Sequence, residues 1–247
     1  ALTIEAWIYP TKNSGAQSIV SKLSSAEAYG YKLTSDNGWS NVFFHLYSNA
    51  SNNNITSDVA LTPVLLDSWH HIAATYDGAD MKIFIDGIEV KSASQIGNIK
   101  TNTNDLVIGA QRPSSGNADG NFTNYFEGSL DELRIWNVAR SAAQINYSKE
   151  ITLDGDEAGL VAYYQFNQGT AEGNNSGITS LTEEINSLNG AFPTSTAFDL
   201  TGITSNFVNS YDNTPAAAAA SGAIEVVVTG GSSSYSYQWF KGSEEVV

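Results

Sequence analysis

Residues 69–90, WHHIAATYDGADMKIFIDGIEV, decide the fold class of this 247-residue chain. Two Asp-Gly pairs, Asp77-Gly78 and Asp86-Gly87, separate short runs of alternating apolar residues. Asp-Gly favours the tight turns of β-hairpins, because glycine adopts positive φ at little cost. The stretch therefore predicts an antiparallel meander with strands at His70–Tyr76, at Met81–Ile85 and around residues 88–90.

The same alternation recurs on both sides of this meander. In residues 2–9, Leu2, Ile4, Ala6 and Ile8 are predicted to share one face of a strand, and Pro10 ends the run. Further predicted strands are Ser18–Leu23, Tyr29–Thr34, Val42–Tyr47, Leu106–Ile108, Leu160–Phe166, Ala197–Leu200 and Asn206–Val208. The pattern predicts an all-β domain.

One helix and one long loop interrupt the strands. Ser141 and Gln144 have the spacing of a capping box, which predicts a helix over Ala142–Ser148. Residues 169–190 are polar and rich in glycine and asparagine, so we expect a long surface loop there.

Composition excludes several classes of function. The chain has 26 acidic and 11 basic residues, hence a formal charge of −15, and it has no cysteine. So acidic a chain lacks the cationic surface that binds nucleic acid or anionic membranes. Without cysteine, disulfide scaffolds, thiolate zinc sites and thiol nucleophiles are excluded. The apolar runs are too short for membrane insertion.

The composition changes at Thr214. Pro215 and the alanines after it predict a linker over 213–222, and the alternation from Ile224 onward predicts part of a second β-module over 223–247. The first domain is then 1–212. The chain opens directly on a strand and stops in an apolar run, so we expect it to be a segment of a longer protein with neighbouring modules.

Four stretches occur in a characteristic order: TIEAWIYP (3–10), the meander of 69–90, FEGSLDELRIWNVARSAAQI (126–145) and GLVAYYQF (159–166). Together they resemble the laminin-G-like jelly-roll domains of the concanavalin A-like lectin/glucanase superfamily, which includes pentraxins. The resemblance covers roughly residues 1–210. It implies a two-sheet antiparallel jelly-roll sandwich, and it implies a further N-terminal strand that this sequence lacks.

The tail, VVVTGGSSSYSYQWFKG at 226–242, resembles the tandem surface-repeat modules of large gliding or adhesin proteins from Bacteroidota-type bacteria. Immunoglobulin-like modules also carry a Tyr-x-Trp core and stay an alternative. Either resemblance implies an extracellular location, secreted or attached to the cell surface.

Because the superfamily includes glucanases, one hypothesis is a glycan-cleaving enzyme. Retaining glycosidases need two carboxyl groups about 5 Å apart, which the glucanase pattern Glu-x-Asp-x-x-Glu supplies. With Asp131 at the central position, the two glutamate positions fall on Ser129 and Arg134. Asp131 and Glu132 are predicted to point to opposite faces of a strand, so they cannot act as one catalytic pair. We expect a structural role for them, one accepting hydrogen bonds from loop amides, and a role in metal or ligand binding is the alternative. We therefore expect no enzyme activity.

Metal sites have limited support. His45, His70 and His71 lack the spaced partners that zinc needs, so we expect structural histidines. Pentraxin-like domains bind calcium through six to eight converging oxygens at one end of the sandwich. By resemblance the corresponding loops here offer Glu27 and Asp119, which leaves open one weaker Ca²⁺ site in place of the pentraxin double site.

Residues 110–124 are the better candidate for ligand binding. Arg112, Asn117 and Asn121 supply planar donors and acceptors, and Phe122 supplies an apolar face, as carbohydrate sites require. The alternative is a flexible polar loop. Trp39, within SDNGWSN (35–41), is either an exposed stacking platform or a core residue.

The sequence thus predicts a non-catalytic extracellular recognition or adhesion module of a large bacterial surface protein. Its expected partner is a glycan or, failing that, a surface protein. Two alternatives stay open: a structural spacer in an adhesin stalk, and an ancillary domain of a secreted glycoside hydrolase or protease.

Overall fold

The computed structural model describes residues 1–24, 29–36, 38–50, 52–56, 64–111, 122–170, 173–192 and 226–227. The elements in chain order are β1 (Leu2–Pro10), β2 (Gln17–Ser24), β3 (Tyr29–Asp36), β4 (Asn41–Tyr47), β5 (Asn52–Thr56), β6 (His70–Tyr76), β7 (Asp80–Ile85), β8 (Ile88–Ser94), β9 (Val107–Ile108), β10 (Gly128–Trp136), α1 (Ala142–Ser148), β11 (Leu160–Tyr164), β12 (Ser180–Leu181), β13 (Gly190–Ala191) and β14 (Val226–Val227).

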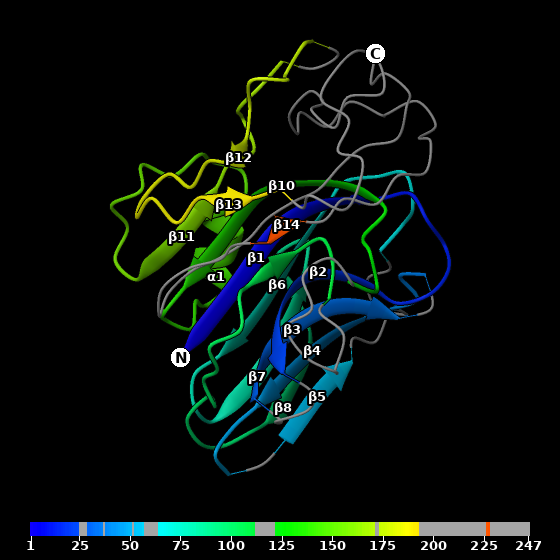
Figure 1. Ribbon diagram of the computed structural model, residues 1–247. Helices are drawn as coiled ribbons and strands as arrows, with labels where there is room; N and C mark the ends of the chain where they lie inside the picture. Colours follow the sequence, from blue (N-terminus) through cyan, green and yellow to red (C-terminus); the bar gives the residue numbers. More distant parts are fainter. Residues whose placement is uncertain are drawn as a thin grey trace.

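Within these residues the strands form two antiparallel sheets (Figure 1). The first sheet has the order β11-β10-β1-β6-β7-β8, and the second has the order β12-β13-β14-β9-β2-β3-β4-β5. One apolar core lies between them: Ile4 and Ile8 come from the first sheet, Leu33 and Phe44 from the second, and none has exposed surface. The predicted two-sheet antiparallel sandwich is confirmed.

Local sequence patterns predicted most elements well. β6 and α1 have the predicted bounds, and most other predicted strands differ by two residues or fewer. At α1 the backbone N–H of Gln144 donates to Ser141 Oγ, and the backbone N–H of Ser141 donates to Gln144 Oε1, so the capping box is present. Asp86 and Gly87 both have positive φ, 53° and 82°, as the predicted hairpin turn requires.

The loop predicted over 169–190 was wrong in part, because this segment contributes β12 and β13 to the second sheet. The buried carboxylate of Glu183 anchors it by accepting hydrogen bonds from the backbone N–H groups of Tyr163 and Asn186, at 2.9 and 2.6 Å. Such a long-range anchor leaves no local pattern in the sequence.

Few residues of the C-terminal part are described. Val226 and Val227 pair with β9 and β13, so these two residues of the predicted second module lie in a sheet of the sandwich. The rest of 223–247, the linker 213–222 and the predicted strands Ala197–Leu200 and Asn206–Val208 lie outside the described residues. The division into domains stays a prediction. No helix of the described part is long and apolar enough to cross a membrane.

Helix α1 covers the outer face of the first sheet, where Ile145 packs on Ala73 and Phe84. The guanidinium of Arg134, 1% exposed, donates to the backbone carbonyls of Ser148 and Ile151, both at 2.7 Å. These bonds fix the end of the helix to β10. The chain itself therefore covers this part of the outer face of the first sheet.

Candidate functional site

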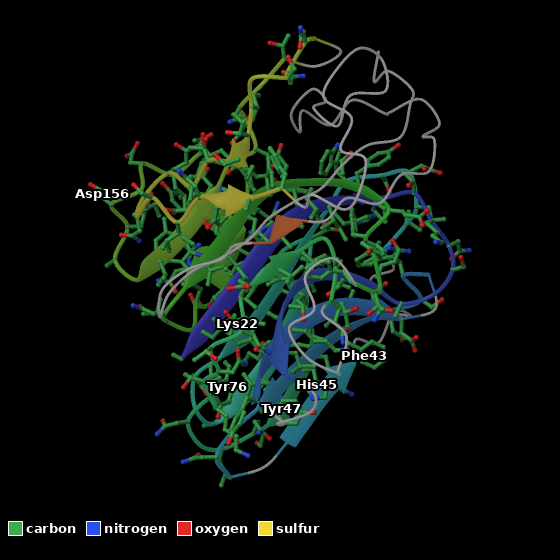
Figure 2. The ribbon with its side chains drawn as sticks, viewed as in Figure 1. Lys22, Phe43, His45, Tyr47, Tyr76 and Asp156 are labelled. Atoms are coloured by element: carbon green, nitrogen blue, oxygen red, sulfur yellow. The ribbon has the colours of Figure 1, made fainter. Side chains whose placement is uncertain are left out.

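The outer face of the second sheet carries a set of half-buried side chains. In β4 every second residue from Val42 to Leu46 is buried in the core. Since successive strand residues point to opposite faces, Phe43, His45 and Tyr47 lie on the outer side, where each is half-buried. Figure 2 labels them in a line along β4, with His45 between the two aromatic residues. The ring centroids of His45 and Tyr47 are 4.8 Å apart.

Strand register places two further residues beside His45. Lys32 of β3 pairs with His45, and Ser21 of β2 pairs with Lys32. Directly paired residues in antiparallel strands have Cβ atoms about 4.5–5.5 Å apart. Ser21, Lys32 and His45 therefore form a polar row across three strands, flanked along β4 by Phe43 and Tyr47. These five residues are called the β2–β4 face below.

The residues that flank the polar segment 112–121 lie at this face. Gln111 and Thr123 exchange two backbone hydrogen bonds of 2.8 Å. Lys32 Nζ donates to Gln111 Oε1 at 3.1 Å, and Asn124 Nδ2 donates to the same oxygen at 3.1 Å. Gln111, which belongs to the predicted binding segment 110–124, thus contacts Lys32.

Two polar atoms of the β2–β4 face have no hydrogen-bond partner among the described residues. They are Ser21 Oγ and His45 Nε2, and both atoms are buried. Leaving a buried polar group unpaired costs about 1–3 kcal/mol, and few such groups stay unpaired in native proteins. These atoms are therefore candidates for hydrogen bonding to a bound ligand.

The protonation of the face follows from its burial. Burial, and to a smaller extent the charge of Lys32, lowers the pKa of His45 to about 4. Burial also lowers the pKa of Lys32. Because His45 is neutral at pH 7, its imidazole offers one donor and one acceptor. The face can therefore hydrogen-bond to hydroxyl groups, which both donate and accept.

The stacking-platform interpretation of Trp39 was wrong, since the structure supports the core alternative. Trp39 is 2% exposed, and its ring packs edge-on against Phe126 with centroids 5.6 Å apart. Its own φ of 67° and the φ of 71° at Gly38 turn the chain so that the ring faces inward. The composition of the 35–41 segment marked the turn but not the direction of the ring.

Phe122 is not an exposed apolar platform either. It is 6% exposed and packs with Val107, Ala110 and Tyr125 over the outer side of β9. The other predicted ligand residues, Arg112, Asn117 and Asn121, lie outside the described residues, and so do the predicted calcium ligands Glu27 and Asp119. Their roles stay predictions.

Asp131 and Glu132 do not separate to opposite faces as expected. A β-bulge in β10 gives Glu132 a φ of 52°, and both residues line one pocket of about 200 Å³, together with Lys149, Glu150, Ile151, Thr152 and Asn167. The carboxylate of Glu132 accepts hydrogen bonds from Arg134 and from the hydroxyl of Tyr163. The structural role predicted for Glu132 therefore fits its contacts.

The adjacent histidines make structural contacts. His70 lies 2.7 Å from the Asp86 carboxylate through Nδ1, and its Nε2 lies 3.1 Å from the backbone nitrogen of Leu65. His71 is 1% exposed and lies 3.7 Å from Glu5. In the described part of the chain, no three His, Asp or Glu side chains come together as metal ligands.

Sequence reasoning missed the β2–β4 face. His45 was expected to be structural, and Ser21, Lys32, Phe43 and Tyr47 were not candidates. The alternation of Val42–Tyr47 does contain a usable signal, because it puts two aromatic residues and a histidine on the polar side of an amphipathic strand. The lateral neighbours depend on register, which the sequence alone does not give.

Comparisons with known proteins agree with this fold. The chain is 28% identical to mouse Pappalysin-1 over 177 residues, which is 65% of this chain and 10% of Pappalysin-1. The chain thus spans about a tenth of that relative. A crystal structure from Bacteroides ovatus, of a protein provisionally assigned to carbohydrate binding, matches with a TM-score of 0.58 and 21% identity, over 77% of this chain and 51% of that one. This likeness concerns the fold alone.

The family evidence comes from the N-terminal part of the chain. The profile Laminin_G_3, described as the concanavalin A-like lectin/glucanases superfamily, matches residues 1–146. This range includes β1 to β10 and most of α1, and hence all five residues of the β2–β4 face. Since the match covers more than half of the chain, the protein belongs to this family.

Proposed function

We propose that this chain is a non-catalytic glycan-binding module that acts outside the cell as part of a longer surface or secreted protein. Its ligand lies on the β2–β4 face, and the ligand-binding roles predicted for Arg112 and Asn117 are a separate part of the proposal. The adhesin setting is a further part of the proposal, and it rests on the resemblance of the tail alone.

The observation that carries the proposal is the composition of the β2–β4 face. Phe43 and Tyr47 supply apolar ring faces for the C–H side of a sugar, and the row between Ser21 and His45 supplies donors and acceptors for its hydroxyl groups. Few, well-placed polar groups between aromatic surfaces are typical of small-ligand sites. The likeness to a carbohydrate-binding fold is consistent with this assignment.

The lack of the glucanase carboxylates in strand β10 supports a binding role. A retaining glycosidase needs two carboxyl groups about 5 Å apart, one as nucleophile and one as acid/base, and the glucanase pattern Glu-x-Asp-x-x-Glu supplies them. In β10 the carboxylate of Glu132 is held by Arg134 and Tyr163, and position 129 is a serine. We therefore propose recognition without cleavage.

A glycan array followed by calorimetry on the 247-residue chain tests the proposal. Replacing both aromatic residues (Phe43→Ala with Tyr47→Ala) is expected to weaken binding at least tenfold, with an unchanged circular dichroism spectrum. Tyr147→Ala is the matched control, because Tyr147 is 77% exposed on α1, on the other sheet. Equal binding by both variants, or no binding by the folded native chain, overturns the proposal.

The same titration, run with calcium and again with a chelator, tests whether glycan binding needs the predicted Ca²⁺ site. Binding that survives chelator assigns recognition to the β2–β4 face alone. Binding lost in chelator adds the predicted Ca²⁺ site, with Glu27 and Asp119 as the carboxylate ligands.

A further inference from the structure

We propose that the β2–β4 face selects acidic glycans, and that Lys32 binds the anionic group of the sugar, a carboxylate or a sulfate ester. The inference rests on the proposed function and names the class of glycan that this site takes. It follows from three features of Lys32: its position, its hydrogen-bonding neighbours and its lack of an ion pair among the described residues.

The position of Lys32 is central. It pairs with Ser21 on one side and with His45 on the other. A sugar ring lying against Phe43 or Tyr47 of β4 would put a ring substituent over the neighbouring strand β3, where Lys32 lies. The cation is thus beside the aromatic residues, where a ring-bound acidic group would reach it.

The neighbours of Lys32 leave hydrogen-bonding capacity for an anion. An ammonium group has three N–H donors, and the described contact of Lys32 Nζ is with Gln111 Oε1. Ser21 Oγ and His45 Nε2, on its two sides, are buried without a partner among the described residues. A carboxylate has two oxygens and accepts several hydrogen bonds, so it satisfies a cation and an adjacent hydroxyl together.

The charge of Lys32 is also uncompensated within the described part of the chain. The lysines that form ion pairs there have carboxylate partners within 2.9 Å: Lys12 with Glu127, Lys82 with Glu89, and Lys149 with Glu150. Lys32 has no such partner among the described residues, although the chain has 26 acidic and 11 basic residues. A half-buried cation without a counterion, in so acidic a protein, favours an anionic ligand over a neutral one.

The site is distinct from the pocket at Asp131 and Glu132. That pocket lies at β10 and the segment after α1, in the first sheet, and three carboxylates and Lys149 line it. Two of these carboxylates are ion-paired with neighbouring cations, Glu132 with Arg134 and Glu150 with Lys149. Lys32 of the β2–β4 face has no carboxylate partner among the described residues, so an anionic ligand is expected at the second sheet.

The experiment compares glycans that differ only in charge. The probes are a galacturonic acid trimer and its methyl ester, sialyllactose and lactose, and a sulfated and an unsulfated galactose disaccharide. The full chain is titrated with each pair by calorimetry at two salt concentrations. We expect the acidic member of at least one pair to bind at least tenfold more tightly, and the preference to shrink at high salt.

Variants then assign the preference to Lys32. Lys32→Met keeps an unbranched apolar stem and removes the charge. The acidic and the neutral glycan of each pair are therefore expected to bind this variant with the same affinity. Lys32→Arg retains the charge and is expected to retain the preference. Lys82→Met is the matched control, because Lys82 is an exposed lysine of the first sheet, and it is expected to leave the preference unchanged.

The outcomes distinguish this inference from the proposed function. If neutral glycans bind as tightly as acidic ones, and Lys32→Met changes nothing, the selectivity is refuted and glycan binding stands. If the folded chain binds no member of any pair but binds a neutral glycan of the array, the selectivity alone is refuted; if it binds neither the probes nor the array, both are refuted. A preference confined to the sulfated or the carboxylated probes, and lost in Lys32→Met, supports the assignment and identifies the acidic group.

Discussion

The carboxylate of Glu5 accepts a hydrogen bond of 2.8 Å from the indole Nε1–H of Trp136, and the two residues are 0% and 2% exposed. Glu5 Oε1 also accepts from Arg140 at 2.8 Å. Residues more than a hundred positions apart are thereby joined on the outer face of the first sheet. This network fixes the segments beside α1 to the first sheet, whereas the candidate ligand-binding residues lie on the second sheet.

The bond between Trp136 and Glu5 yields the first prediction. Trp136→Phe removes one donor from a buried carboxylate, and hydrogen bonds to charged groups contribute about 1.5–3 kcal/mol. Trp39→Phe is the control, since Trp39 is also 2% exposed but its Nε1 has no partner among the described residues. Urea unfolding at pH 7 should show that Trp136→Phe loses about 1.5–3 kcal/mol more than Trp39→Phe. Equal losses would mean that the bond contributes nothing.

The second prediction concerns pH. Burial lowers the pKa of His71 well below 6.5, and the charges of Arg134, Lys149 and Arg140 act in the same direction. The folded state therefore keeps His71 neutral, while the unfolded chain takes up a proton below about pH 6.5. Hence the free energy of unfolding should fall as the pH drops below 6.5, by up to about 1.4 kcal/mol per pH unit from this residue.

His71→Gln isolates that contribution. The variant lacks the titrating group, so its stability should depend less steeply on pH between about 6.5 and 5 than the stability of the native chain. Urea unfolding at several pH values measures both slopes. Parallel curves for the two proteins would show that His71 is not held neutral in the fold.

The third prediction concerns Gly30 in β3, where φ is +92° and an added Cβ would lie 1.8 Å from the carbonyl oxygen of Lys22. Gly15 has a φ of +69° with no atom within 4 Å of an added Cβ. Gly15→Ala should lower the free energy of unfolding by about 1–2 kcal/mol, through its backbone conformation alone. Gly30→Ala should lower it by about 1–3 kcal/mol more, because the clash forces the β2–β3 pairing to shift. Thermal unfolding distinguishes them, and similar midpoints would contradict the geometry.

Parts of this molecule follow from local sequence and parts do not. The strand of Leu2–Pro10 and the capping box at Ser141 are set by neighbours a few residues away, so alternation and spacing predict them well. The inward ring of Trp39 and the bulge at Glu132 depend on contacts between strands distant in sequence. A local pattern carries no information about such contacts.

The candidate site divides in the same way. The alternation in Val42–Tyr47 is enough by itself to put Phe43, His45 and Tyr47 on one side of a strand. That Lys32 and Ser21 lie beside His45 follows only from the register of β2, β3 and β4. A shift of one residue would have turned Lys32 toward the core.

The last prediction uses Ser21, whose Oγ is buried without a partner among the described residues. In the protein without ligand, Ser21→Ala removes an unpaired hydroxyl and should raise the free energy of unfolding by about 1 kcal/mol. The control is Thr34→Val on the same sheet, because Thr34 Oγ1 donates to the Gln17 carbonyl at 2.7 Å, so its loss should be destabilising.

In the glycan titration, Ser21→Ala should weaken binding, since stability and function often oppose each other at a site that is prepared for a ligand. Urea unfolding and calorimetry measure the two effects on the same samples. If Ser21→Ala destabilises the protein, or leaves the glycan affinity unchanged, the prediction is wrong. The Ser21 hydroxyl would then be hydrogen-bonded within the protein and would not bind the ligand.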